Sequence, residues 1–141
     1  GAIIRSAEVV GASGLVIPAN RSASVSEATF RTSAGAVEHL PIAKVANLVQ
    51  AIQALKEADF WIAAADQHAA QDIWQSNLKG RIGLVLGAED SGISERVATA
   101  CDFSFRLPQR GHTESLNVSA AAAAIAFEWM RQNFDQGQAP A

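Results

Sequence analysis

Short apolar runs alternate along this chain with segments in which apolar residues recur at helical spacing. The apolar runs predict strands at residues 14–18, 60–65, 82–86 and 103–107. Helical spacing or capping signals predict helices at residues 3–10, 25–34, 45–55, 93–101 and 116–133. Strands that alternate with helices indicate an α/β fold with a mostly parallel sheet flanked by helices.

The ends and the length of the chain add three expectations. The chain opens directly on a helical pattern, whereas parallel α/β domains usually begin with a strand, so we expect a first strand before Gly1. Residues 1–133 are predicted to form a single domain, because a chain of 141 residues is long enough to bury one core. The polar residues 134–141 are expected to be a frayed tail.

Composition narrows the class of protein. Apolar residues make up 49% of the chain, and neither a membrane-length apolar run nor a leader is visible, so we expect a soluble, cytoplasmic globular protein. The single Cys101 excludes an internal disulfide and a cysteine-cluster metal site. The net charge of −3 argues against bulk electrostatic binding of nucleic acid, although residues 1–56 carry five basic and three acidic residues.

Ligands of parallel sheets bind beyond the carboxyl ends of the strands. The loops that follow three of the predicted strands begin at Ala65, Gly87 and Pro108, and the third leads into Ser115 and Asn117. We therefore expect a pocket formed by these three loops.

Several common catalytic motifs are missing. Gly87 and Gly92 have the spacing of a phosphate-binding loop, but Ile93-Ser94 stands where Lys-Ser/Thr is required. The chain contains neither the G-x-G-x-x-G of a dinucleotide site after a strand nor the G-x-S-x-G of a hydrolase. The three histidines have no spacing typical of metal ligands, so no metal is expected.

The polar residues near the predicted loops have ordinary structural interpretations as well. Ser115 and Asn117 could cap the alanine-rich helix that follows them, and on that stretch alone capping is the favoured interpretation. Glu89 could likewise cap a helix that starts near Ser91, and Arg5 could be a surface residue of the first helix. These residues suggest function only when they are taken together.

Three segments in the same chain carry a family resemblance. They are GAIIRSAEVVGA at residues 1–12, LVLGAEDSGIS at residues 84–94 and RLPQRGHTESLNVSAAAA at residues 106–123. Together they resemble the three ordered motifs of the SpoU/TrmH family of RNA ribose 2′-O-methyltransferases, within the SPOUT class. Residues 16–48 are most similar to the branch that methylates a guanosine in large-subunit ribosomal RNA.

The resemblance implies a deep trefoil knot at the C-terminal end, a homodimer, and a bound S-adenosylmethionine held mainly by backbone groups. By motif position, the cofactor-binding residues would be Ala65, Leu86, Gly87, Leu107 and Leu116. The substrate implied is RNA, with ribosomal RNA expected rather than transfer RNA, and no membrane or metal is involved.

The resemblance also implies catalytic roles for Arg5, Glu89, Ser115 and Asn117. Because arginine stays protonated, we expect Arg5 to clamp an RNA phosphate and stabilise the developing alkoxide, while the other three orient Arg5 and the ribose. The asparagine of the family's first motif would precede Gly1, and the RNA-binding domain common in this branch is not in the sequence. The alternative hypothesis is therefore a non-catalytic RNA-binding or dimerisation module with the same fold.

Overall fold

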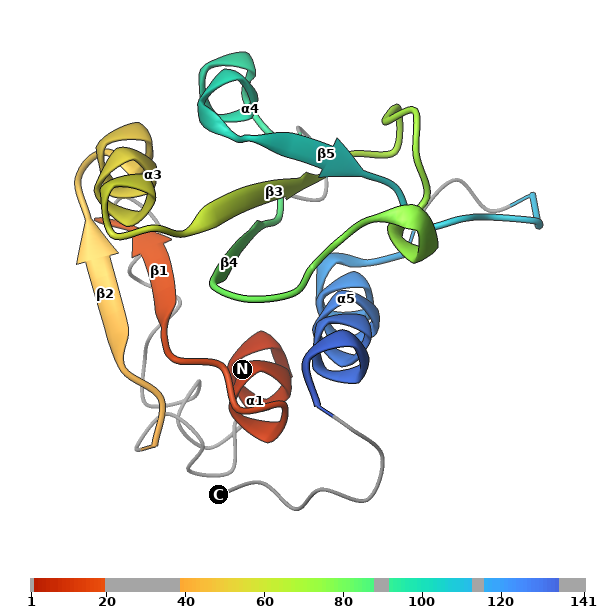
Figure 1. Cartoon of the computed structure of the whole chain (residues 1–141), viewed down its shortest axis with the longest axis horizontal. Helices are drawn as coiled ribbons and strands as arrows, with labels where there is room; N and C mark the ends of the chain where they lie inside the picture. Colours follow the sequence, from red (N-terminus) through yellow and green to blue (C-terminus); the bar gives the residue numbers. More distant parts are fainter. Residues whose placement is uncertain (1, 20–38, 88–91, 113–115, 135–141) are drawn as a thin grey trace. The chain divides into compact units, whose positions relative to one another are not determined.

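The computed structural model describes residues 2–19, 39–87, 92–112 and 116–134 (Figure 1). The chain forms two compact units, and the boundary lies between Leu48 and Val49. The predicted helix at residues 25–34 and the tail after residue 134 lie outside the described residues.

The first unit contains helix α1 (Ala2–Val9) and the parallel strands β1 (Leu15–Pro18) and β2 (Ile42–Val45). The apolar stripe of α1 buries Ile4 against Leu40, as its helical spacing predicted. The helix ends where Gly11 adopts a φ of 79°, and this left-handed conformation suits a glycine after a helix.

Strand β2 is the main error of the sequence-based prediction, which started a helix at Val45. The structure instead ends a strand at Val45 and begins helix α3 (Leu48–Glu57) three residues later. The strand has only four residues, and Ala43 and Lys44 are exposed, so it leaves no apolar run in the sequence. Among the described residues, the strands form two parallel sheets rather than one.

The second unit contains a parallel sheet of three strands in the order β4-β3-β5, with bounds Trp61–Ala65 for β3, Ile82–Val85 for β4 and Phe103–Phe105 for β5. These strands confirm three of the predicted apolar runs to within two residues. Besides α3, the remaining elements are the 3₁₀ turn η3 (Ile73–Gln75), α4 (Glu95–Ala100) and α5 (Val118–Asn133).

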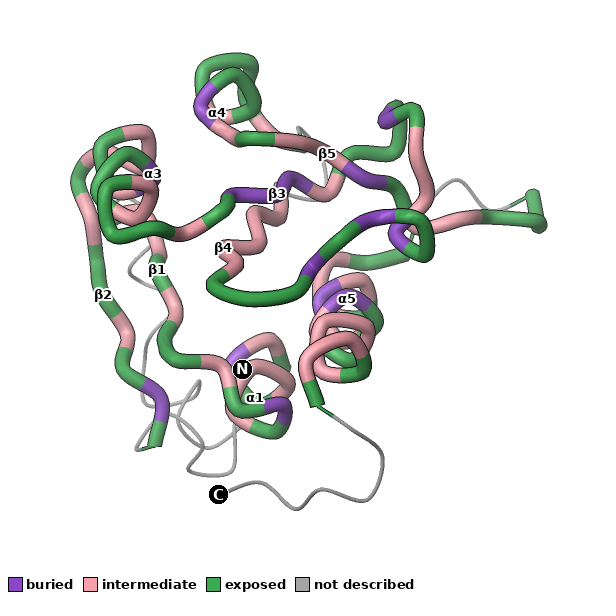
Figure 2. Tube along the Cα trace, in the orientation of Figure 1, coloured by how far each residue is buried: buried purple, intermediate pink, exposed green. Residues whose placement is uncertain are grey.

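Strand β3 lies at the centre of this sheet and is buried on both faces (Figure 2). On one face Ala63 packs in a cluster with Phe105 of β5 and Ile125 of α5, all fully buried. On the other face Ile62 approaches Gly83 so closely that a Cβ added there would lie 2.7 Å from its Cδ1 atom, with Leu55 of α3 also nearby. Helices therefore cover both faces, as the apolar strand sequences predicted.

Asp102 joins three elements at the amino end of β3. Its carboxylate accepts a hydrogen bond of 2.8 Å from the backbone N–H of Ile62 and pairs with Lys56 of α3 at 3.4 Å. Lys56 also donates to the carbonyl of Ala100 at 3.2 Å. The carboxylate thus satisfies a backbone donor of a residue that is itself buried.

We expect Asp102→Ala to lower the free energy of unfolding by about 1–3 kcal/mol, because the N–H of Ile62 loses its acceptor. Asp102→Asn should cost less, about 1 kcal/mol at most, because an amide oxygen can still accept this bond and the lost ion pair is partly exposed. Urea unfolding monitored by circular dichroism measures both changes. Equal losses in the two variants would mean that the ion pair, and not the hydrogen bond, stabilises the fold.

Candidate active site

The carboxyl ends of β3, β4 and β5 lie at one edge of the sheet, because all three strands are parallel (Figure 1). Three of the predicted cofactor-binding residues, Ala65, Leu86 and Leu107, stand at or just beyond these ends. All three are half-buried and pack against the core cluster that contains Phe105. The structure therefore gathers three residues that are far apart in the sequence at a single edge.

Gly87, the fourth predicted cofactor-binding residue, lies where the backbone comes close to itself. A Cβ at this position would lie 2.3 Å from the carbonyl carbon of Gly92 and 2.6 Å from the nitrogen of Ile93. Gly87 and Gly92 therefore lie in contact, and only glycine fits at position 87. Glu89, a predicted catalytic residue, belongs to the segment 88–91 between them and lies outside the described residues.

The chain that follows β3 is fastened along the end of β5. The N–H of Arg106 donates to the carbonyl of Gln71 at 3.0 Å, and the N–H of Ile73 donates to the carbonyl of Arg106 at 2.8 Å. The guanidinium of Arg106 pairs with Asp72 at 2.6 Å. This returning segment forms a fixed wall next to Leu107. The sequence analysis missed it, because Asp72 and Arg106 are 34 positions apart and share no motif.

Asn117 is the N-cap of α5, so the structural interpretation of this residue is confirmed. Its Oδ1 atom accepts hydrogen bonds of 2.8 Å from the backbone N–H of Ala120 and from the hydroxyl of Ser119. Within the described ranges, the amide nitrogen of Asn117 donates to no partner, and the residue is exposed. Capping therefore uses only the oxygen of this side chain, and no described residue accepts from its N–H groups.

The structure describes two of the three remaining predicted site residues. Leu116 directly precedes Asn117 and is 55% exposed. Arg5 is an exposed residue of α1 in the first unit, next to the buried Ile4. Ser115 lies outside the described residues. The catalytic roles of Arg5, Glu89, Ser115 and Asn117 stay predictions.

The described part of the chain contains no group of three histidine, cysteine or acidic residues arranged to hold a metal ion.

The single cysteine lies in surroundings that keep its thiol protonated. Burial, and next the nearby Asp102 carboxylate, raise the pKa of the Cys101 thiol, which donates to the carbonyl of Val97. Cys101 is therefore a neutral thiol at pH 7 and not an activated nucleophile. Over the described residues, no helix has the length and apolar character needed to cross a membrane.

Comparison with known proteins identifies the family. Residues 1–127 match the model of the SpoU rRNA methylase family. The chain belongs to this family. The match includes all the positions assigned above to the candidate site, from Arg5 to Asn117.

Individual SpoU-family proteins and structures agree with this assignment. The chain is 36% identical over 138 residues to a Staphylococcus aureus protein assigned to the TrmH family of tRNA/rRNA methyltransferases, covering 98% of this chain and 56% of that protein. The SpoU methyltransferase AviRb of Streptomyces viridochromogenes, solved with AdoMet, superposes with a TM-score of 0.84 at 29% identity, over 93% of this chain and 54% of AviRb.

An RNA 2′-O ribose methyltransferase superposes equally well on the chain. Its TM-score is 0.84 at 27% identity, over 93% of this chain and 50% of that structure. The chain thus spans about half the length of these relatives.

The contact at Gly87 leads to a test of the loop. We expect Gly87→Ala to lower the free energy of unfolding by about 1–3 kcal/mol, because the added methyl group meets backbone atoms that cannot move independently. Gly111→Ala is the matched control: no atom of the described residues lies within 4 Å of its added Cβ, so its effect should stay within about 0.5 kcal/mol. Chemical unfolding measures both; a Gly87→Ala protein as stable as the control would contradict the close contact.

Proposed function

We propose that this chain is the catalytic domain of an enzyme that transfers a methyl group from S-adenosylmethionine to a ribose 2′-hydroxyl of RNA. The observation that carries the proposal is the gathering of Ala65, Leu86 and Leu107 at one edge of the sheet in a SpoU-family chain. The AdoMet complex of AviRb and the similarity to an RNA 2′-O ribose methyltransferase support the same reaction.

The residues at this edge suit an adenosyl ligand. Half-buried apolar side chains at Ala65, Leu86 and Leu107 can contact the faces of a purine. By family resemblance, Gly87 would bind the cofactor through its backbone groups. Leu116 would complete the binding residues from the start of α5. Bound S-adenosylmethionine would supply a methyl group on a positively charged sulfur. By family resemblance, we propose that the C-terminal segment is threaded through a loop as a deep trefoil knot.

The chain's own polar residues would position the ribose. We assign to Arg5 a bidentate contact with an RNA phosphate and stabilisation of the negative charge that develops on the 2′-oxygen. The oxygen of Asn117 caps α5, while no described residue accepts from its amide nitrogen. The amide N–H groups would therefore donate to the substrate. Glu89 and Ser115 would orient Arg5 and the ribose.

The assembly and substrate are proposed on the resemblance to the family. The active protein would be a cytoplasmic homodimer in which Arg5 of one subunit serves the site of the other. The proposed substrate is a guanosine of large-subunit ribosomal RNA. The S. aureus relative is named for both transfer and ribosomal RNA, so the test must offer both classes.

The deciding experiment uses the full-length protein that contains this chain. It is incubated with S-adenosylmethionine labelled in the methyl group and with ribosomal or transfer RNA transcripts, and the position of the label is mapped by mass spectrometry. We expect the label on a ribose 2′-oxygen. Cofactor binding without transfer to either RNA would contradict the proposal and favour the non-catalytic RNA-binding or dimerisation module.

The divided role of Asn117 can be tested by substitutions that keep the cap. Asn117→Asp and Asn117→Ser retain an oxygen that caps the helix, so stability should change by less than about 0.5 kcal/mol. Both remove the amide donor, and we expect kcat to fall about 10- to 100-fold. Thermal unfolding and methyl-transfer kinetics measure these effects. Wild-type kcat in both variants would reduce Asn117 to a capping residue.

Arg5 allows a complementary test of transition-state stabilisation. We expect Arg5→Ala to lower kcat about 100-fold or more, since it removes the positive charge beside the reacting oxygen. Arg5→Lys should recover only part of this loss, because an ammonium group cannot make the bidentate contact. Calorimetry should find unchanged affinity for S-adenosylmethionine in both. A large loss of cofactor affinity would refute the assigned role.

A further inference from the structure

An open groove lies in the second unit, on the segment that follows the contact between Ile73 and Arg106. Its volume is about 520 Å³, and it is formed by the segment around η3 and by the C-terminal half of α5. Its lining consists mainly of one aromatic residue, two cations and three amides, namely Trp74, Lys79, Arg131, Gln75, Asn77 and Gln132. None of these residues has a role in the site described above.

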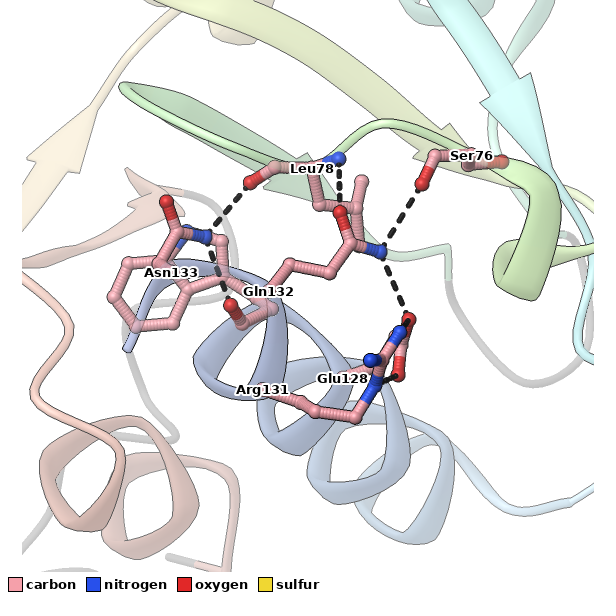
Figure 3. Close-up of polar contacts among 7 residues, drawn as sticks. Ser76, Leu78, Glu128, Arg131, Gln132 and Asn133 are labelled. Carbon is pink, nitrogen blue, oxygen red and sulfur yellow. Dashed lines mark hydrogen bonds and ion pairs between the residues drawn. The ribbon is translucent and has the colours of Figure 1, made fainter. Parts of the chain in front are cut away.

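The floor of the groove is rigid, because α5 holds the segment 76–80 through side-chain amides (Figure 3). Gln132 accepts from the N–H of Leu78 at 2.7 Å and donates to the carbonyl of Ser76 at 3.0 Å. Asn133 donates to the carbonyl of Leu78 at 2.9 Å and accepts from the N–H of Gly80 at 2.8 Å. Four hydrogen bonds therefore fix the backbone that displays the groove, and little ordering is needed when a ligand binds.

Trp74 is the exposed aromatic residue of the groove. Its side chain is 71% exposed, although Ile73 before it and Leu78 after it are fully buried. The buried neighbours anchor the segment while the indole ring stays open to solvent. Exposed aromatic rings on a fixed backbone are the usual platforms on which unpaired nucleobases stack.

The groove can offer a cation to an anionic ligand. Among the described residues, its lining contains Lys79 and Arg131 but no acidic residue, in a chain whose net charge is −3. Arg131 is held by two hydrogen bonds to Glu128, of 2.7 and 2.8 Å, and these bonds lower the pKa of the Glu128 carboxyl. Lys79 has no acidic partner among the described residues, so its charge is available to a phosphate.

We propose that this groove binds one unpaired nucleotide of the RNA substrate, with its base stacked on Trp74 and its phosphate near Lys79. The proposal rests on the proposed function, since it concerns the RNA that the enzyme methylates. Arg131, which lines the same groove, lies 14 residues beyond Asn117, so the rise of an α-helix separates these two residues by about 21 Å. The proposal accordingly assigns to the groove a nucleotide that flanks the methylated one.

The test measures RNA affinity directly with the full-length protein and a fluorescent form of the methylated RNA. We expect Trp74→Ala to weaken RNA binding about 10-fold and Trp74→Phe, which retains an aromatic ring, to restore most of it. The same change should appear in KM for RNA, with kcat and the affinity for S-adenosylmethionine unchanged. Trp61→Ala is the matched control, because Trp61 is similarly exposed but does not line the groove.

Two further measurements test the phosphate contact at Lys79 and the flanking position of the bound nucleotide. Lys79→Gln should reduce the slope of log affinity against log salt by about one. An RNA shortened to the immediate neighbours of the target should bind wild type and Trp74→Ala equally well. A Trp74→Ala defect that persists with the shortened RNA would contradict the flanking position.

The outcomes distinguish this proposal from the proposed function. If wild type binds and methylates RNA while Trp74→Ala behaves like Trp61→Ala, the groove proposal alone fails. If Trp74→Ala instead weakens self-association in sedimentation velocity and leaves RNA affinity unchanged, a second copy of the chain covers the groove and the proposal is wrong. If wild type binds no RNA, the proposed function fails and the groove proposal with it.

Discussion

The parallel pairing of β3 with β4 and β5 is the constraint on which the candidate site depends. The carboxyl ends of these strands can lie at one edge only because all three run in the same direction. Parallel pairing requires connections that cross from one edge of the sheet to the other, as α4 does between β4 and β5. Such crossings leave helices on the faces, and β3 is apolar on both, covered by α5 over Ala63 and by α3 over Ile62.

The chain between β3 and β4 is held mostly by side chains rather than by regular secondary structure. Near the site it is fastened to β5 through Arg106 and Asp72, and farther along it is fastened to α5 through Gln132 and Asn133. Amide and guanidinium groups here satisfy or fix backbone that belongs to no sheet. One irregular segment consequently forms both the wall beside Leu107 and the groove at Trp74.

Asn117, at the start of α5, can cap the helix and also take part in the proposed reaction. Capping requires an oxygen acceptor, and Asn117 supplies it while leaving its amide nitrogen exposed. The capping interpretation of Asn117 is therefore correct without excluding a catalytic one. The catalytic roles of Arg5, Glu89 and Ser115 stay predictions, because the structure tests none of them.

The sequence by itself determined the elements whose evidence is local. The apolar runs predicted β3, β4 and β5 closely, helical spacing predicted α1 and α5, and three ordered motifs predicted the family. Tertiary structure alone revealed β2, which is too short and too exposed to leave an apolar pattern.

Tertiary structure also decided every pairing of distant residues. Arg106 meets Asp72 across 34 positions, and Gln132 reaches Leu78 across 54. Periodicity reports which face of an element is buried, but it carries no information about which distant segment covers that face. The wall beside Leu107 and the groove at Trp74 arise from such pairings, and for that physical reason only the folded chain shows them.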